Sequence, residues 1–169
     1  MFVACEPMGG AKGPTDFATL DKDSDAQVTR SEFAQWGAEQ GVLDMFQGER
    51  EGIVDETSLA SALYTLWNRE GDGLTENEWN DGLKAWFPEA SKQTFTDWDI
   101  NQDLSIDEQE LAAGFAHGNM LQDWDANGDD EVTTDEAVTG IYQVFDTNRD
   151  DSVSRTEWTD AIGRWSWNL

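Results

Sequence analysis

The sequence is poor in basic residues, and also in cysteine, histidine and proline. It has ten Lys and Arg against 36 Asp and Glu, which gives a formal net charge of −26. Nucleic acids and anionic membrane surfaces are bound through basic patches, so neither is an expected partner. No apolar run approaches the roughly 20 residues that a membrane-spanning helix needs. The charge instead favours cations or basic proteins as partners.

The scarcity of cysteine and histidine limits the chemistry available to the chain. One cysteine excludes an intramolecular disulfide. The single histidine, His117 in "GFAHGNM", is more typical of a solvated or capping residue than of a catalyst. The sequence contains no phosphate-binding glycine loop, zinc spacing or nucleophile motif. We therefore do not expect an enzyme.

Apolar and aromatic residues, by contrast, are plentiful. The chain of 169 residues is 38% hydrophobic and 11% aromatic, with nine tryptophans, so it can bury a core as one compact domain or two small ones. Apolar residues recur at helical spacing, as in Trp79, Leu83 and Trp86. Pro88 disfavours helix in the residue before it, which predicts a helix end at 86–87. The sequence therefore predicts an all-α fold.

Four acidic segments share one pattern of twelve residues. They are "DKDSDAQVTRSE" from Asp21, "DINQDLSIDEQE" from Asp99, "DANGDDEVTTDE" from Asp125 and "DTNRDDSVSRTE" from Asp146. Each has Asp at position 1, Asp or Asn at 3, Asp at 5, an aliphatic residue at 8 and Glu at 12, after a large apolar residue. This pattern resembles the calcium-binding loop of the EF-hand family, and the resemblance covers nearly all of the chain from Thr15 onward.

The resemblance implies that each segment wraps one Ca²⁺ in oxygen ligands. Side chains at positions 1, 3 and 5 coordinate, position 7 offers its carbonyl, position 9 acts directly or through water, and Glu at 12 gives two oxygens. The aliphatic residue at position 8 is expected to pair with its counterpart in a neighbouring loop as a minimal β-bridge. The expected ligands are Asp21, Asp23, Asp25, Gln27, Thr29, Glu32; Asp99, Asn101, Asp103, Ser105, Asp107, Glu110; Asp125, Asn127, Asp129, Glu131, Thr133, Glu136; Asp146, Asn148, Asp150, Ser152, Ser154 and Glu157.

Two further segments keep part of the pattern. Residues 68–78, "NREGDGLTENE", are one residue short, and whether they bind a fifth ion through Asn68, Glu70, Asp72 and Glu78 is open. Residues 47–58 keep Gly52 and Val54 but lack Asp at 1 and Glu at 12, so we expect a loop without metal. In chain order the six are called loops 1 to 6: residues 21–32, 47–58, 68–78, 99–110, 125–136 and 146–157.

The loop starts repeat after 78 residues, which predicts a tandem duplication of a three-loop unit. The units span residues 15–87 and 88–169, behind an N-terminal segment 1–14. "EWNDGLKAW" from Glu78 matches "EWTDAIGRW" from Glu157, and Tyr64 matches Tyr142. Only residues 59–67 and 137–145 separate the second and third loop of each unit, so one helix must join them. Such spacing is similar to that of some bacterial multi-EF-hand proteins and unlike the paired lobes of calmodulin.

Position 6 departs from the family pattern, which expects glycine because the backbone has positive φ there. Ala26, Leu104, Asp130 and Asp151 occupy it. Ala or Leu in that conformation costs about 1–2 kcal/mol. We therefore predict weak affinities, typical of extracellular members of the family.

The leading functional hypothesis is a calcium-binding protein whose fold the ion stabilises. One version adds that calcium exposes a Trp-rich surface for a protein partner; the other places the tryptophans in the core and leaves Trp165 and Trp167 as the most exposed. A calcium buffer without a target, or a binder of lanthanides or other hard cations, is the alternative.

The N-terminal "MFVAC" resembles the end of a bacterial lipoprotein signal, followed by a Gly/Pro tether. It predicts a lipid anchor on Cys5 and an extracytoplasmic location, with an ordinary cysteine in a cytoplasmic protein as the alternative.

Overall fold

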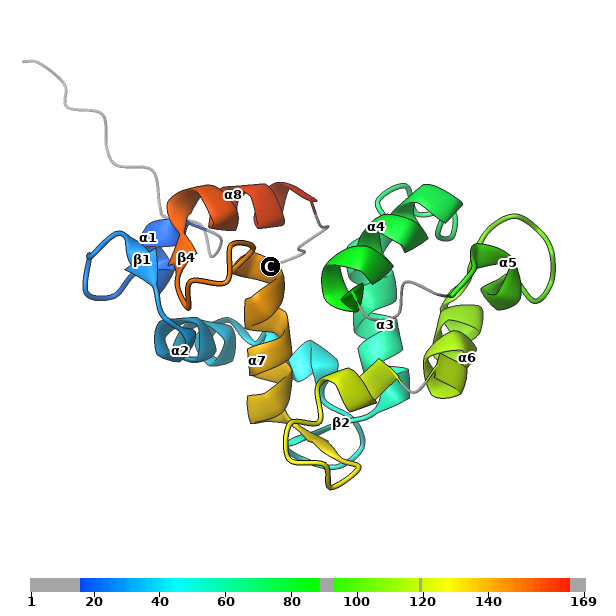
Figure 1. Ribbon diagram of the computed structural model, residues 1–169, viewed down its shortest axis with the longest axis horizontal. Helices are drawn as coiled ribbons and strands as arrows, with labels where there is room; N and C mark the ends of the chain where they lie inside the picture. The colour runs from blue at the N-terminus through cyan, green and yellow to red at the C-terminus, as the bar shows by residue number, and fades with distance from the viewer. Residues whose placement is uncertain (1–15, 89–92, 119, 165–169) are drawn as a thin grey trace, which may run out of the picture.

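The computed structural model describes residues 16–88, 93–118 and 120–164 (Figure 1). Cys5 and its tether, and Trp165 and Trp167, lie outside the described residues. The expectation of a mainly helical protein is confirmed, with strands of two residues each. The elements are α1 Phe17–Leu20, β1 Gln27–Val28, α2 Arg30–Gln40, η1 Leu43–Phe46, β2 Ile53–Val54, α3 Glu56–Trp67, α4 Glu76–Trp86, α5 Phe95–Trp98, α6 Glu108–Gly118, η3 Met120–Asp123, β3 Val132–Thr133, α7 Thr134–Phe145, β4 Val153–Ser154 and α8 Arg155–Arg164.

The helices begin at local signals in the sequence. Thr29, Thr75 and Thr133 are N-caps of α2, α4 and α7. Each forms a capping box with the glutamate three residues later, in which side chain and backbone satisfy each other's free groups. As the short spacing predicted, α3 alone joins loops 2 and 3, and α7 alone joins loops 5 and 6. Helix α4 ends at Trp86, two residues before Pro88.

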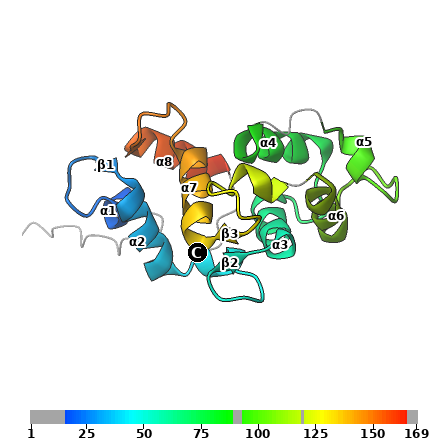
Figure 2. The same ribbon diagram turned by 60° about the horizontal axis from the view of Figure 1, so that its bottom comes forward.

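The helices form two groups that lie side by side (Figure 1). One group contains α1, α2, α7 and α8, from the two ends of the chain, and the other contains α3 to α6, from its middle. The chain therefore crosses from the first group to the second before α3 and returns before α7. Strands β2 and β3 lie between the groups (Figure 2).

Three short antiparallel pairings join the loops, each at position 8 or, in the shorter loop 3, at Leu74, the seventh residue. Val28 pairs with Val153, Val54 with Val132, and Leu74 with Ile106. The prediction of β-bridges between loops is thus confirmed. The pairing order, which the sequence left open, is loop 1 with 6, loop 2 with 5 and loop 3 with 4. Every one of these pairings joins a loop before residue 88 to a loop after it.

Aromatic side chains fill the core of both groups. Phe145 stacks on Trp158 with ring centroids 5.1 Å apart, and Trp36 meets Trp158 edge-on at 5.1 Å. Seven tryptophans are described, and all are buried: Trp36, Trp67, Trp79, Trp86, Trp98, Trp124 and Trp158. The interpretation of the tryptophans as core residues is confirmed for these seven.

Three of these tryptophans pack against helical glycines. Trp67, Trp98 and Trp124 each precede a loop, and each ring lies against the glycine four residues after that loop: Gly82, Gly114 and Gly140. In loops 2 and 6 a smaller aromatic, Phe46 or Phe145, stands before the loop, and an alanine takes the later position. A larger aromatic before a loop is therefore matched by a smaller residue four positions after it, so the space between them stays filled, as close packing requires.

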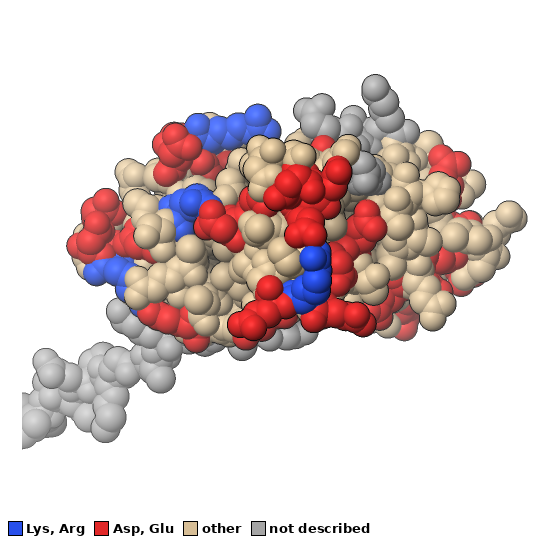
Figure 3. Space-filling view, turned by 90° about the horizontal axis from the view of Figure 1, so that it is seen from below, with Lys and Arg blue, Asp and Glu red and all other residues tan. Residues whose placement is uncertain are grey.

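The surface is strongly acidic. On the face seen from below, Asp and Glu side chains are scattered in patches and outnumber Lys and Arg (Figure 3). Within the described part of the chain, no helix has the length and apolar character needed to cross a membrane.

Candidate metal centre

Loops 1, 4 and 6 begin where a helix ends. Asp21, Asp99 and Asp146 are the C-caps of α1, α5 and α7, and their backbone N–H groups donate to the carbonyl four residues earlier. Asp125 of loop 5 follows η3 in the same way, with its N–H 3.0 Å from the Leu121 carbonyl. The first predicted ligand of each strong loop is thus held at the end of a helix.

The carboxylate at position 1 organises the backbone of its loop. In all four strong loops it accepts hydrogen bonds from the N–H groups of positions 5 and 6. In loop 1, the N–H groups of Asp25 and Ala26 both lie 3.1 Å from Asp21 oxygens. The corresponding distances are 3.1 and 3.1 Å in loop 4, 3.3 and 2.9 Å in loop 5, and 3.2 and 3.0 Å in loop 6. The four loops therefore share one conformation.

Positions 3 and 5 turn their side chains along the same backbone. Asp23, Asn101, Asn127 and Asn148 each accept the N–H of position 5, and each position 5 aspartate accepts the N–H of position 7. In loop 1, oxygen atoms of Asp21, Asp23 and Asp25 lie within 4.8 Å of one another. Loops 4, 5 and 6 carry a neutral Asn at position 3, so they bring fewer carboxylates together than loop 1 does.

The tight turn of each loop depends on left-handed backbone. Position 6 has positive φ as predicted: 72° at Ala26, 70° at Leu104 and 64° at Asp130 and Asp151. Position 4 does too, at Ser24, Gln102, Gly128 and Arg149. This second left-handed residue was not predicted from the sequence. Gly128 and, in loop 3, Gly71 were the available signals, since glycine is the residue that accepts positive φ without strain.

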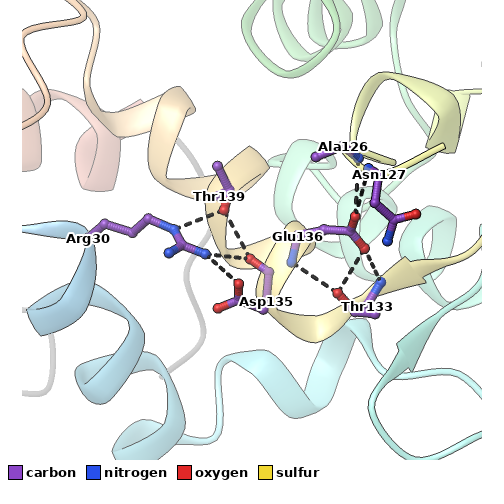
Figure 4. Close-up of polar contacts among 7 residues, drawn as sticks. All are labelled: Arg30, Ala126, Asn127, Thr133, Asp135, Glu136 and Thr139. Carbon is purple, nitrogen blue, oxygen red and sulfur yellow. Dashed lines mark hydrogen bonds and ion pairs between the residues drawn. The ribbon is translucent and has the colours of Figure 1, made fainter. Parts of the chain in front are cut away.

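The glutamate at position 12 joins the two ends of its loop. In loop 5, Glu136 accepts hydrogen bonds from the N–H groups of Ala126 and Asn127 at one carboxylate oxygen and from Thr133 at the other (Figure 4). Glu32 and Glu157 make the same two-sided contact, and so does Glu110 with Asn101 and Asp107. Position 9 side chains, at Thr29, Asp107, Thr133 and Ser154, cap the following helix.

Burial of charge is concentrated at these loop ends. The buried acidic residues of the described chain are Glu78, Asp99, Glu110, Asp146 and Glu157, each of them the first or the last residue of a loop. Glu78 has a cationic partner, Arg69, at 3.7 Å. Among the described residues, no ion pair involves Asp99, Glu110, Asp146 or Glu157. Buried charges are normally paired with an opposite charge or bound to metal, and no basic side chain of the described residues takes that place in loops 4 and 6.

Glu32, Glu136 and Glu157, the last residues of loops 1, 5 and 6, remain ionised. Burial acts to raise the pKa of Glu157, but hydrogen bonds from the backbone of Ser154 and Asn148 outweigh it and hold the pKa below its usual value. The same balance of burial against hydrogen bonds from Thr29 lowers the pKa of Glu32. For Glu136 the hydrogen bonds from Thr133 are the main cause. These carboxylates therefore carry full negative charge near neutral pH.

An arginine from the far end of the chain reaches loop 5. Arg30, on α2, forms an ion pair with Asp135 at 2.9 Å and donates to the Asp135 carbonyl and the Thr139 hydroxyl (Figure 4). Asp135 is the neighbour of Glu136 but is not a predicted ligand. Arg50 of loop 2 pairs with the side chain of Glu131 at 2.9 Å. Both contacts join residues more than 80 positions apart, which no local sequence pattern signals.

The two weaker loops each contain an arginine, but only that of loop 3 pairs with an acidic residue of its own loop. In loop 3, Arg69 lies beside Glu78 and also 3.9 Å from Asp81, while Glu70 and Asp72 are exposed. Asn68 accepts the N–H of Gly71 at 2.7 Å. Loop 2 keeps the turn, with Gly52 at φ 79°, and Asp55 caps α3 by accepting the N–H of Ser58. His117 is exposed in the last turn of α6.

Comparison of the chain with protein-family models, with curated proteins and with solved structures found no match.

Proposed function

We propose that this chain is a calcium-binding protein of the EF-hand type, and that calcium stabilises its fold. The observation that carries the proposal is the pair of buried carboxylates in loop 4, Asp99 and Glu110, and the equivalent pair in loop 6, Asp146 and Glu157. Both pairs lack a cationic partner among the described residues. A divalent cation bound between them would supply the missing charge.

The donor set fits calcium. Carboxylate, amide and carbonyl oxygens are hard donors, and Ca²⁺ takes six to eight of them in a flexible shell. We propose that positions 1, 3, 5 and 12 of loops 1, 4, 5 and 6 hold the ion with the carbonyl of position 7, and with position 9 directly or through water. When bound, the ion supplies two positive charges to an acidic loop. The chain's own contribution is the shared backbone conformation that gathers these groups.

We propose four ions rather than five. Arg69 already provides a positive charge at Glu78, the closing residue of loop 3, and loop 2 lacks the first and last ligands. Binding at four loops offsets part of the formal charge of −26, so the calcium-free chain should be loosened by repulsion.

A stabilising role agrees with the burial of seven tryptophans. In the sensor alternative, calcium would rearrange the helices and expose part of this aromatic core to a protein partner. Tryptophan fluorescence and hydrophobic-dye binding distinguish the two. A stabilising role gives less dye binding with calcium than without it, and a sensor gives more.

The test is a calcium titration followed by calorimetry, native mass spectrometry and circular dichroism. We expect four bound ions, a gain in helical signal and a higher melting temperature. Each site adds about 2.7 kcal/mol of stability when free calcium is a hundred times its dissociation constant. Retention of no ions in millimolar calcium would contradict the proposal.

A matched pair of variants makes this test specific. Glu110 and Glu108 lie in the first turn of α6, but only Glu110 is a proposed ligand. Glu110→Gln should remove one ion from the count, whereas Glu108→Gln, which makes the same charge change at an exposed site, should leave four.

Two further points stay open to experiment. Oxygen-rich loops also accept trivalent ions, so competition between terbium and calcium tests the lanthanide alternative. The lipid anchor on Cys5 and an extracytoplasmic location stay predictions. Mass spectrometry of the protein from its native source checks them, because an unmodified Cys5 behind an intact Met1 would exclude the anchor.

A further inference from the structure

We propose that Tyr142 couples calcium binding in loop 1 to calcium binding in loop 6, so that the two sites fill cooperatively. The proposal rests on the calcium function proposed above. It goes beyond that function because it assigns a positioning role to a residue that is not a ligand, and because it limits cooperativity to one of the three loop pairs.

The hydroxyl of Tyr142 lies between the two loops. It is 2.8 Å from the Val28 carbonyl oxygen of loop 1 and 3.1 Å from the Asp151 carbonyl oxygen of loop 6. The side chain is buried, with only 5% of its surface exposed, and it belongs to α7, the helix that leads into loop 6. A hydroxyl has one hydrogen to donate, so both loops share the same donor.

These carbonyls are next to the proposed carbonyl ligands. Val28 follows Gln27, which is position 7 of loop 1, and Asp151 precedes Ser152, which is position 7 of loop 6. The two loops also pair directly, because Gln27 is in register with Ser154 and Val28 with Val153. A change in backbone position at either site therefore moves a group that the other site shares.

Only this pair joins two complete ligand sets. Loop 5 pairs with loop 2, which begins with Gln47 and ends with Ser58. Loop 4 pairs with loop 3, in which Arg69 stands beside Glu78. Loops 4 and 5 should consequently bind their ions without a second ion as partner.

Tyr64, which matches Tyr142 in the duplicated sequence, has different surroundings. It is half-buried; burial raises its pKa, and a hydrogen bond with the side chain of Asn68 acts in the opposite direction. Tyr64 therefore contacts the first residue of the short loop 3 and serves as the matched control for Tyr142.

The physical basis of the coupling is shared ordering. An ion in loop 1 holds the strand that pairs with loop 6 and the carbonyl that Tyr142 contacts, so the second ion has less backbone left to order. Coupling between two sites is typically 5- to 150-fold and is reciprocal by thermodynamic necessity.

The experiment follows each site separately by amide NMR during calcium titration of the full chain. The position 6 amides of Ala26, Leu104, Asp130 and Asp151 each donate to the position 1 carboxylate of their own loop, so each reports one site. Glu157→Gln disables loop 6 and should raise the midpoint at Ala26 at least fivefold. Glu110→Gln disables loop 4 and should leave that midpoint unchanged.

Reciprocity gives a second test. Glu32→Gln should lower the calcium affinity of loop 6, which is read at the Asp151 amide. The factor should equal the one by which Glu157→Gln lowers the calcium affinity of loop 1. In Tyr142→Phe this factor should fall about two- to tenfold, the range expected for one hydrogen bond. In Tyr64→Phe it should not change. An unchanged factor in Tyr142→Phe, or an Ala26 midpoint indifferent to Glu157→Gln, overturns the proposal.

A third measurement applies even if Tyr142→Phe folds poorly. The chain has two tyrosines, so fluorotyrosine labelling gives two fluorine signals. The Tyr142 fluorine signal should shift when calcium binds loop 1 of the Glu157→Gln variant, and also when calcium binds loop 6 of the Glu32→Gln variant. A signal that does not shift refutes the coupling role of Tyr142. If all four amide reporters respond to calcium but independently, the coupling fails while the proposed function stands; if none responds, the proposed function itself fails.

Discussion

Gly82 on α4 lies directly against the indole ring of Trp67 at the end of α3. A Cβ placed on Gly82 would be 2.6 Å from ring atom Cε2, and the ring is fully buried. The glycine is therefore required by the close approach of the two helices.

We predict that Gly82→Ala lowers the free energy of unfolding by about 1–3 kcal/mol, because the added methyl overpacks the core. Gly163→Ala is the matched control. Gly163 is also helical, but no described atom lies within 4 Å of a Cβ built there, so the better helix propensity of alanine should stabilise by roughly 0.5–1 kcal/mol. Urea unfolding in excess calcium measures both, and equal effects would rule out the close packing.

Leu104 combines two unfavourable features at position 6 of loop 4. It has φ 70°, and 82% of its side chain is exposed. Leu104→Gly removes the strain without losing buried surface, so we expect calcium affinity at loop 4 to rise several-fold, for a gain of about 1 kcal/mol.

Ile100, at position 2 of the same loop, is the control for Leu104. It is also exposed, at 65%, but does not have positive φ. Ile100→Gly should therefore give no gain in affinity. Calorimetric titration of both variants tests the strain, and a gain in Ile100→Gly as large as that in Leu104→Gly would contradict it.

High salt should stabilise the calcium-free protein, as bound calcium does, by reducing repulsion among the acidic loops. Raising NaCl from about 10 mM to 1 M shortens the Debye length from about 30 to 3 Å, which screens repulsion among the acidic loops. We expect the chelated protein, with its formal charge of −26, to gain melting temperature with salt, and the calcium-loaded protein to gain less. Thermal unfolding at several salt concentrations measures the difference. The same gain in both forms would mean that the bound ions are not relieving repulsion.

We predict that titration of Tyr142 lowers the stability of the folded protein at high pH. Burial, with the nearby carboxylates of Asp146 and Asp151, raises the pKa of Tyr142 from its usual 10.0 to about 12. Between pH 10 and 12 the unfolded chain has lost this proton while the folded chain keeps it, so the free energy of unfolding falls as pH rises, by roughly 1.4 kcal/mol per unit. This contribution is fully present below pH 10.

Urea unfolding in chelator across this range, compared with Tyr142→Phe, isolates the effect from other titrations. The wild type should lose stability more steeply than the variant between pH 10 and 12. Parallel curves would show that the Tyr142 hydroxyl titrates in the folded protein as it does in the unfolded chain.

Much of the local structure could be predicted from the sequence because its causes are local. The Thr and Glu three residues apart at positions 9 and 12 specify a helix start wherever they occur, as at Thr29 and Thr133. The alternate Asp and Asn residues bend the backbone through hydrogen bonds two to five residues away. The nine-residue gaps allowed only one helix between loops. The second left-handed residue at position 4 was missed, because Ser24, Gln102 and Arg149 are not residues that usually mark positive φ.

The helical fold, the loop pattern with its acidic ligand candidates, and the internal repeat thus follow from local features of the chain. The partners of the loops came to light in the folded chain, where Val28 pairs with Val153, Leu74 pairs with Ile106, and Tyr142 contacts both Val28 and Asp151. Except for Tyr142 with Asp151, those contacts join residues far apart in the chain, and each lies within one of the two helix groups, so it forms only once the helices of that group have packed together. Hydrogen bonds within a loop act over a few residues, whereas the choice of partner loop depends on burying the aromatic core of both groups at once.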